Sequence, residues 1–316
     1  MKKLLALLFS LTFVMNSATA AEKITIGLAV DQLFESRVAE NDAIKDEAAK
    51  RGYSVIEVVA DGDAQTQNQQ IQSLITQGVK AILVCAVDQN TIERALMAAD
   101  RAGIAIVAYD RSLAKSRVVD TFVGPDSLAD GRLAGAYTAK QLAKVKGEKV
   151  IVELIGALND QNGIDRSKGF REAIEGLDNV KLIEVPTDWD SARALSGTQN
   201  AFQANPIVHS VFAATDTHIP SVETVLTDLG KLKPAGTDGH VVITGINGSL
   251  DGYQATSKGI ADGIVVMNLD KIGRTAVDLA EKLINGETVE RRNVVSGNFY
   301  TTDNIQQHKD AIWGAK

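Results

Sequence analysis

Short apolar runs alternate with amphipathic stretches along most of this 316-residue chain. The apolar runs show little of the polar alternation of a half-exposed sheet, which indicates strands covered on both faces. The amphipathic stretches have helical spacing, and several end at a glycine, a common helix stop. In the first part of the chain the pattern predicts strands at 24–30, 53–60, 81–87 and 104–110, and helices at 37–52, 65–78 and 91–103. Such alternation predicts a parallel sheet.

The pattern starts again near residue 127. It predicts helices at 127–145, 167–177, 191–205, 219–230, 250–259 and 272–286, strands at 149–156, 180–186, 208–215, 241–247 and 260–268, and an extended segment at 293–301. The chain therefore contains two similar sets of strand–helix units, and it is longer than the usual limit for one hydrophobic core. Together these features predict two lobes of similar architecture. No Pro- or Ser-rich linker separates the sets, so we expect the chain to cross between the lobes several times. The expected class is α/β, with a parallel central sheet in each lobe.

The first twenty residues have the pattern of a secretory signal peptide. Lys2 and Lys3 precede an apolar run over residues 4–15, and the segment 18–20 (Ala-Thr-Ala) supplies a small-residue cleavage site. The run is shorter than the roughly 18 apolar residues that a transmembrane helix needs, and no later segment reaches that length. We therefore expect export and cleavage after Ala20.

Charge and cysteine content argue against several classes of function. The formal net charge is −7, and removal of the two lysines of the signal peptide makes it −9. An acidic balance argues against nucleic acid or an anionic membrane as the partner. Cys85 is the only cysteine, so no internal disulfide can form, and the four histidines are too scattered for a zinc site. We expect no metal and no cofactor.

Polar side chains follow nearly every predicted strand. In open α/β sheets ligands bind at the carboxyl ends of the strands, so the residues there form the candidate site. They are Asp31, Phe34, Arg37, Asp110, Arg111, Asp160, Asn162, Trp189, Thr215, Asn247 and Asn268. Carboxylates and amides accept hydrogen bonds, guanidinium groups donate them, and a hydroxyl does both. The set therefore suits a small neutral sugar or polyol.

Asp110, Arg111 and Trp189 carry the most specific expectations. Asp110 and Arg111 follow a buried strand directly. As an ion pair they would hold each other's geometry before the ligand arrives, which lowers the ordering cost of binding. Trp189 stands between two aspartates and, like Phe34, offers a flat face to the C–H side of a sugar ring.

Several candidates also have a structural interpretation. Helix capping would explain Asp31, Asp110 and the Thr215-Asp216 pair. An ordinary polar turn would explain residues 160–162. Phe34 could simply pack over the helix that follows it. Arg37 fits a solvated helix start, although a cation there opposes the helix dipole.

An enzyme is an alternative functional reading, because glycosidases use two carboxyl groups about 5 to 9 Å apart. Against it, Arg37 and Arg111 should lower the pKa of neighbouring acids, whereas a general acid needs a raised one.

The chain resembles periplasmic sugar-binding proteins of bacterial ABC importers, the ribose/xylose/galactose type, and most closely the xylose-binding proteins. The stretches that carry the resemblance are IGLAVDQLFESR (26–37), VAYDRSL (107–113), NDQNG (159–163) and TDWD (187–190). By this resemblance the Asp110-Arg111 pair clamps the sugar and Trp189 stacks on it. Three contact positions depart from the family pattern: Thr215 stands for Asn, Asn247 for Asp and Asn268 for a Lys of the xylose type.

The resemblance implies two Rossmann-like lobes joined by a three-crossing hinge, the type I periplasmic binding protein fold. The N-terminal lobe would comprise residues 21–125 plus 268–296, and the C-terminal lobe residues 126–267 plus 297–316. It implies a monomeric, periplasmic protein that is not an enzyme. The protein would close on a monosaccharide or polyol, first of all a pentose such as xylose, and deliver it to ABC permease subunits in the membrane. A periplasmic sugar sensor for a chemoreceptor or a kinase is the alternative.

Overall fold

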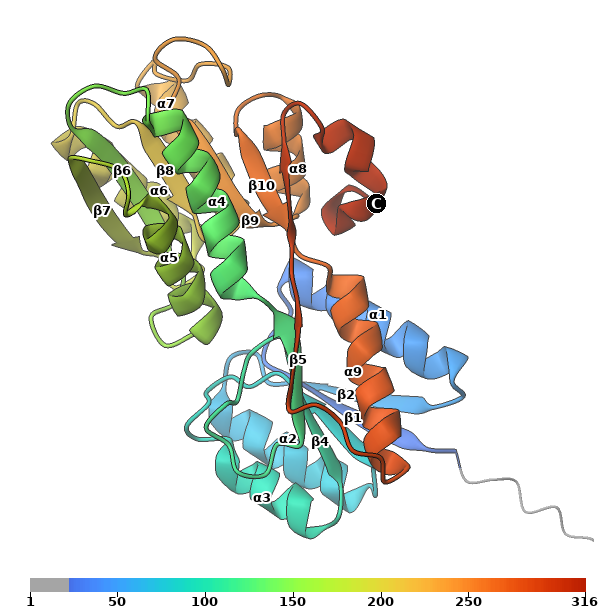
Figure 1. Ribbon diagram of the computed structural model, residues 1–316. Helices are drawn as coiled ribbons and strands as arrows, with labels where there is room; N and C mark the ends of the chain where they lie inside the picture. Colours follow the sequence, from blue (N-terminus) through green and yellow to red (C-terminus); the bar gives the residue numbers. More distant parts are fainter. Residues whose placement is uncertain (1–22) are drawn as a thin grey trace, which may run out of the picture.

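The computed structural model describes residues 23–316 and places them in two α/β lobes (Figure 1). The expected signal peptide lies outside the described residues. Each lobe has a six-stranded sheet, and parallel pairs dominate both sheets, which confirms the fold class that the strand–helix alternation predicts. Within residues 23–316, no helix has both the length and the apolar character that a membrane crossing requires.

The first lobe has the strand order β11-β5-β4-β3-β1-β2, and all its strand pairs are parallel. The inner strands β3 and β5 are buried along their whole length, as expected for strands with helices on both faces. The strands are β1 (Thr25–Val30), β2 (Ser54–Val59), β3 (Ala81–Val84), β4 (Ala105–Tyr109), β5 (Thr121–Pro125) and β11 (Arg292–Val295). The helices are α1 (Glu35–Lys50), α2 (Ala64–Thr76), α3 (Glu93–Arg101) and α9 (Leu269–Ile284).

The second lobe has the order β12-β10-β9-β8-β6-β7, and only β12 runs antiparallel to its neighbour among the described strands. The strands are β6 (Lys149–Ile155), β7 (Val180–Pro186), β8 (Ser210–Ala213), β9 (Val242–Asn247), β10 (Gly263–Val266) and β12 (Asn298–Thr301). The helices are α4 (Ser127–Leu142), α5 (Gln161–Ile174), α6 (Ser191–Ala204), α7 (Ile219–Asp228) and α8 (Leu250–Ser257), with 3-10 turns η1 (Asp216–His218), η2 (Ile305–Ala311) and η3 (Trp313–Ala315).

Three elements differ from the sequence-based expectation. The apolar pattern misses β5, because its run holds only two large apolar residues before Gly124 and Pro125. The extended segment at 293–301 is two strands, β11 and β12, which belong to different sheets. Helix α5 begins at Gln161 rather than at residue 167, so the polar residues that read as a turn form its first turn.

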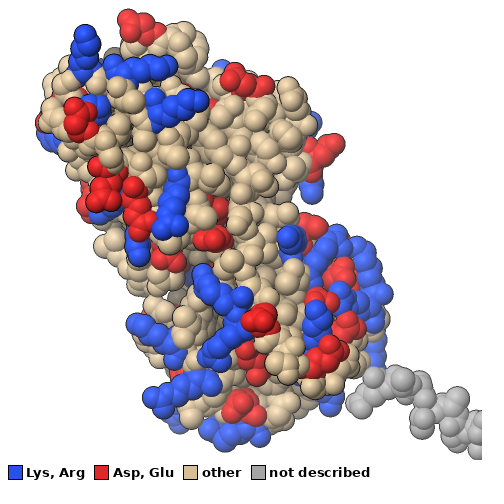
Figure 2. Space-filling model, in the orientation of Figure 1, with Lys and Arg blue, Asp and Glu red and all other residues tan. Residues whose placement is uncertain are grey.

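The chain passes between the lobes three times: after β5, after β10, and between β11 and β12. After the second passage, α9 packs against α1 in the first lobe. Figure 2 shows Lys/Arg and Asp/Glu side chains interleaved on this side of the lobe, where Arg51 pairs with Glu281 and Arg274 with Glu47. These ion pairs help to hold α9 in the first lobe, so residues 267–269 stand at the boundary between the lobes.

Asp130 on α4 connects two of the passages. The carboxyl group is fully buried, and its Oδ1 accepts a hydrogen bond from the backbone N–H of Gly297 at 2.9 Å. Burial raises the pKa of Asp130 to about 6, although the Gly297 N–H acts in the opposite direction. One buried side chain thus joins the start of α4 to the passage between β11 and β12.

Gly131 sets the distance between α4 and α5. A Cβ atom at this position would lie 2.2 Å from the carbonyl oxygen of Arg166. Because that oxygen belongs to the backbone, relieving the clash would require a shift of the helix itself. We expect Gly131→Ala to lower the free energy of unfolding by about 1–3 kcal/mol through overpacking. Gly176→Ala is the control, because a Cβ there meets no atom within 4 Å. Equal urea-unfolding midpoints for the two variants would contradict this account of the packing.

Candidate ligand-binding site

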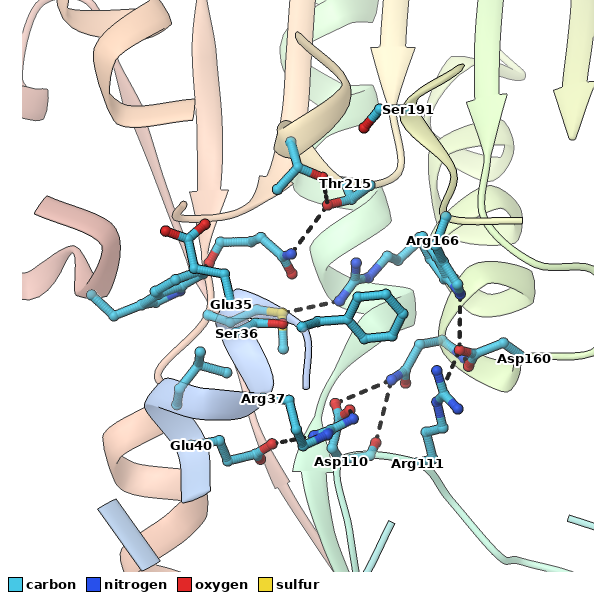
Figure 3. A pocket seen from close by; sticks show the side chains of 18 residues that line it. Glu35, Ser36, Arg37, Glu40, Asp110, Arg111, Asp160, Arg166, Ser191 and Thr215 are labelled. Carbon is cyan, nitrogen blue, oxygen red and sulfur yellow. Dashed lines mark hydrogen bonds and ion pairs between the residues drawn. The ribbon is translucent and has the colours of Figure 1, made fainter. Parts of the chain in front are cut away.

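A cavity of about 260 Å³ lies between the two lobes. Both lobes line it, and many of its residues follow the carboxyl ends of strands (Figure 3). The lining residues are Phe34, Glu35, Ser36, Arg37, Glu40, Asp110, Arg111, Asp160, Asn162, Arg166, Trp189, Ser191, Thr215, Thr217, Asn247, Met267, Leu269 and Trp313. Nine of the eleven residues selected from the sequence therefore line one cavity; Asp31 and Asn268 do not.

Arg37 is the centre of a buried ion cluster in the first lobe. Its side chain is 5% exposed, and it pairs with Asp31 (Nε to Oδ1, 3.0 Å), with Glu40 and with Asp110. Burial acts to lower the pKa of Arg37, but the carboxylates around it, Asp110 foremost, raise it well above its ordinary value. The guanidinium group is therefore a permanent cation at the wall of the cavity.

The carboxyl groups of this cluster respond to burial in different ways. Burial acts to raise the pKa of Asp110, but Arg37 and Arg111 outweigh it and hold that pKa below its usual range. For Glu40, burial dominates and raises the pKa well above its usual range. Asp110 therefore stays a hydrogen-bond acceptor at neutral pH.

The expected ion pair between Asp110 and Arg111 is wrong. Asp110 pairs with Arg37, whereas Arg111 pairs with Asp31 (Nη1 to Oδ2, 2.9 Å) and Asp160 (Nε to Oδ2, 3.1 Å). The reason is local: Asp110 has a φ of 57°, and this left-handed turn directs the two neighbouring side chains to different partners. Asp31 lies behind the cavity wall, where its two oxygens hold Arg37 and Arg111.

Two contacts join the lobes across the cavity. Arg111 of the first lobe pairs with Asp160 of the second, and the Asn162 amide donates to Asp110 Oδ1 at 3.2 Å. Asp160 is also the N-cap of α5 and accepts the Asn162 N–H at 2.9 Å. Instead of the ordinary polar turn that the sequence allowed, these residues begin α5, and Asp160 and Asn162 also line the cavity.

The sequence reading missed Arg166, which lies on α5 and is only 4% exposed. Its Nη1 donates to the carbonyl oxygen of Ala214 at 2.8 Å, and its guanidinium group stands 5.7 Å from the centre of the Trp189 ring. A search limited to the residues after each strand cannot find Arg166. Helical spacing can identify it, because Arg166 is four residues after Asn162 and lies on the same face of the helix.

The two aromatic candidates reach the cavity from opposite lobes. Phe34 is the residue before α1. Trp189 lies in the loop after β7, and its Nε1 donates to Asp160 at 3.1 Å. Its φ of 63° is rare for a bulky side chain, which marks local strain of the kind that clusters at functional sites. The ring packs against Gly156, where a Cβ would come within 2.1 Å of it.

Thr215 and Asn247 line the part of the cavity at the ends of β8 and β9. The Asn247 amide donates to Thr215 Oγ1 at 3.1 Å, and the hydroxyl of Thr217 lies 3.0 Å from the same oxygen. Asp216 is fully buried beneath them and accepts the backbone N–H groups of Gly248 (2.7 Å) and Ser249 (3.1 Å). Asp216 is therefore structural, and it shapes the loop after β9.

The prediction that Asn268 contacts the ligand is corrected by its position in the structure. Its side chain is exposed and accepts the Lys271 N–H at 3.1 Å as the N-cap of α9. Met267, one position earlier, lines the cavity instead. In an extended segment neighbouring side chains point to opposite sides, so an assignment shifted by one residue places the wrong one in the site.

Asp216 gives a pH prediction. Burial raises its pKa to about 7, with the hydrogen bonds from Ser249 and Gly248 opposing the change. Between about pH 4 and 7 the folded state keeps a proton that the unfolded chain has released, so this group lowers stability as pH rises, by up to about 1.4 kcal/mol per unit. Asp216→Asn keeps the acceptor oxygen and should lose less stability from pH 5 to pH 8 than the parent. Parallel losses in urea unfolding would refute the assignment.

Comparisons with known proteins agree on one family. A family model described as a periplasmic binding protein domain matches residues 32–288. The ribose import binding protein RbsB of Escherichia coli (strain K12) is 31% identical over 294 residues, which cover 92% of this chain and 96% of that protein.

Two solved structures have the same fold. One, from Mycobacterium smegmatis in complex with beta-D-fucofuranose, has a TM-score of 0.83 and 28% identity and covers 90% of this chain and 93% of its own. The other is an ABC transporter solute binding protein from Bacillus halodurans C-125 with bound myo-inositol. Its TM-score is 0.83 at 25% identity, over 92% of this chain and 98% of its own.

Proposed function

Because this chain belongs to the periplasmic binding protein domain family, we propose that it binds one small neutral sugar or polyol between its lobes and passes it to the permease of an ABC importer. A pentose such as xylose is the proposed ligand. The chain acts in the periplasm after removal of the signal peptide. It is a carrier and not an enzyme, in keeping with its solute-binding relatives.

One observation carries the proposal: the cavity is lined from both lobes by side chains that donate and accept hydrogen bonds in several directions. Arg37, Arg111 and Arg166 supply donors, and Asp110 and Asp160 supply acceptors. Hydroxyl groups need both kinds, because each donates one hydrogen bond and accepts others. The aromatic faces of Phe34 and Trp189 suit the C–H surface of the same molecule.

The charges of the site favour a neutral ligand. Arg37 is surrounded by three carboxyl groups, and Arg111 lies between two. Hydrogen bonds to charged groups contribute about 1.5–3 kcal/mol each, and micromolar affinity corresponds to about 8 kcal/mol. A few such bonds and one stacked ring reach that value after the ordering costs of association.

The ligands of relatives agree with this chemistry. The ribose protein of Escherichia coli is named for a pentose, and the two solved structures hold a deoxyhexose furanose and a cyclic polyol. All are small, uncharged and rich in hydroxyl groups. They support the ligand class, and they leave the member of the class to be found by experiment.

A thermal-shift screen tests the proposed function. Residues 21–316 are purified and heated with a panel of pentoses, hexoses and polyols at 1 mM, and titration calorimetry follows for each stabilising compound. A ligand at 100 times its dissociation constant adds about 2.7 kcal/mol, a shift of several degrees in a chain of this size. If no sugar or polyol raises the melting temperature, the proposal fails.

Trp189→Ala is expected to weaken binding of the best ligand about tenfold, because the site loses its stacked ring and the N–H that orients Asp160. Trp189→Phe is the matched control, since it keeps a ring but not the N–H. We expect its affinity to fall between those of the parent and Trp189→Ala in calorimetry. An unchanged dissociation constant for Trp189→Ala would mean that the ligand binds elsewhere.

A further inference from the structure

One corner of the cavity differs in character from the rest. Met267, Leu269 and Trp313 line it together, and they come from the passage between β10 and α9 and from the C-terminal turn η3. Met267 and Leu269 are almost fully buried, so what they leave accessible faces the cavity that they line. We call these three side chains the apolar corner.

The polar atoms of the apolar corner already have partners. The Asn247 carbonyl oxygen accepts the Trp313 indole N–H at 2.7 Å and the Met267 backbone N–H at 2.9 Å, which uses both of its lone pairs. The Met267 Sδ, a weak acceptor, takes a hydrogen bond from Arg166 Nη2 at 3.0 Å. The three side chains therefore present carbon and an occupied sulfur to a ligand.

We propose that the apolar corner selects a sugar that ends there in a methyl or methylene group rather than a hydroxymethyl group. The ligand class is thus a 6-deoxyhexose, a 5-deoxypentose or a pentopyranose. This inference rests on the proposed sugar-binding function and makes it more specific. A hydroxyl placed in the corner loses its water without gaining a protein partner, and an unsatisfied buried hydroxyl weakens binding roughly 5- to 150-fold.

Matched sugars isolate this effect. The pairs are D-fucose with D-galactose and L-rhamnose with L-mannose, each differing by one hydroxyl. D-xylose with D-glucose is added to compare a methylene with a hydroxymethyl group. Calorimetry on residues 21–316 is expected to show the less hydroxylated member binding at least about fivefold more tightly in every pair that binds.

A substitution in the corner separates polarity from shape. Met267→Gln has a similar length and places a carboxamide beside the ligand, so the preference within a pair should shrink or reverse. Met267→Leu leaves the corner without a new hydrogen-bonding group and should keep the preference. Circular dichroism of both variants verifies that they are folded before binding is compared.

The outcomes distinguish this inference from the proposed function. Equal or tighter binding of the hydroxylated members overturns the inference, and so does binding of myo-inositol by a protein that binds none of the paired sugars. Both of these results leave sugar or polyol binding intact. If no sugar or polyol binds, the proposed function fails, and the inference fails with it.

Discussion

Arg37→Ala is expected to abolish ligand binding and to lower the free energy of unfolding by about 3–5 kcal/mol, the range for removing one partner of a buried ion pair. The arginine is bound by Asp31, Glu40 and Asp110 in a place with little access to water. Without it, three buried carboxyl groups lose their shared cation. The loss of stability should be larger at pH 8 than at pH 5, because protonation relieves carboxyl groups that have no counter-ion.

Urea unfolding and calorimetry measure the two effects of Arg37→Ala separately. Arg132→Ala is the matched control: Arg132 pairs with Glu172, but its side chain is 54% exposed, and an exposed pair contributes about 0–1 kcal/mol. The control should bind ligand like the parent. A stability of Arg37→Ala within 1 kcal/mol of the control would show that the buried cluster is not as tightly coupled as its geometry indicates.

Arg111→Ala should have the second-largest effect on binding, at least about a hundredfold, with a smaller effect on stability than Arg37→Ala. Arg111 lies in the first lobe, lines the cavity, and forms an ion pair with Asp160 of the second lobe. Its loss removes both the proposed ligand donor and an ion pair between the lobes, and charge-assisted contacts of this kind contribute about 1.5–3 kcal/mol each. The Asp31 carboxylate keeps Arg37 as a partner, so the folded state is less affected.

The control for Arg111→Ala is Arg193→Ala. Arg193 also pairs with an aspartate near Trp189, Asp188, but both side chains are largely exposed. The control should leave the dissociation constant within about twofold, because exposed ion pairs are weak. Small-angle scattering with saturating ligand adds a second readout: the parent should become more compact than Arg111→Ala. Equal affinity of parent and Arg111→Ala would remove this arginine from the site.

The polar strand ends could be predicted from sequence for a physical reason. Parallel strands begin and end at common edges of a sheet, so residues after separate strands meet although they are far apart in the chain. This rule brought together Asp110, Asn162, Trp189 and Asn247 from four regions of the sequence. The same rule gives no information about helix faces, and for that reason it missed Arg166 and Glu40.

Pairing within the site depended on local backbone geometry. Adjacent opposite charges at 110 and 111 suggested one ion pair, but the positive φ of Asp110 turned the two side chains to Arg37 and Asp160 respectively. Nothing in the pattern of residue types records that turn. Likewise, the choice between Met267 and Asn268 depends on which side of an extended segment faces the cavity, and one residue of offset reverses it.

The contribution of the C-terminal segment to the cavity was the hardest feature to predict from the sequence. Trp313 lies more than sixty residues from Asn247 in sequence, yet its indole N–H binds the carbonyl oxygen of that residue. Its position follows from β12, which returns the chain to the second lobe after β11 has completed the first. The apolar corner therefore exists only because the chain passes between the lobes a third time, a property of topology rather than of local sequence.

The most direct test of the central claim is a crystal structure of residues 21–316 with the best-binding sugar from the screen. We expect the sugar in the cavity between the lobes, within hydrogen-bonding distance of Asp110 and Arg111 from one side and of Asn162 or Arg166 from the other, with the Trp189 ring against its C–H face. A sugar bound outside this cavity, or contacted by one lobe alone, would contradict the account.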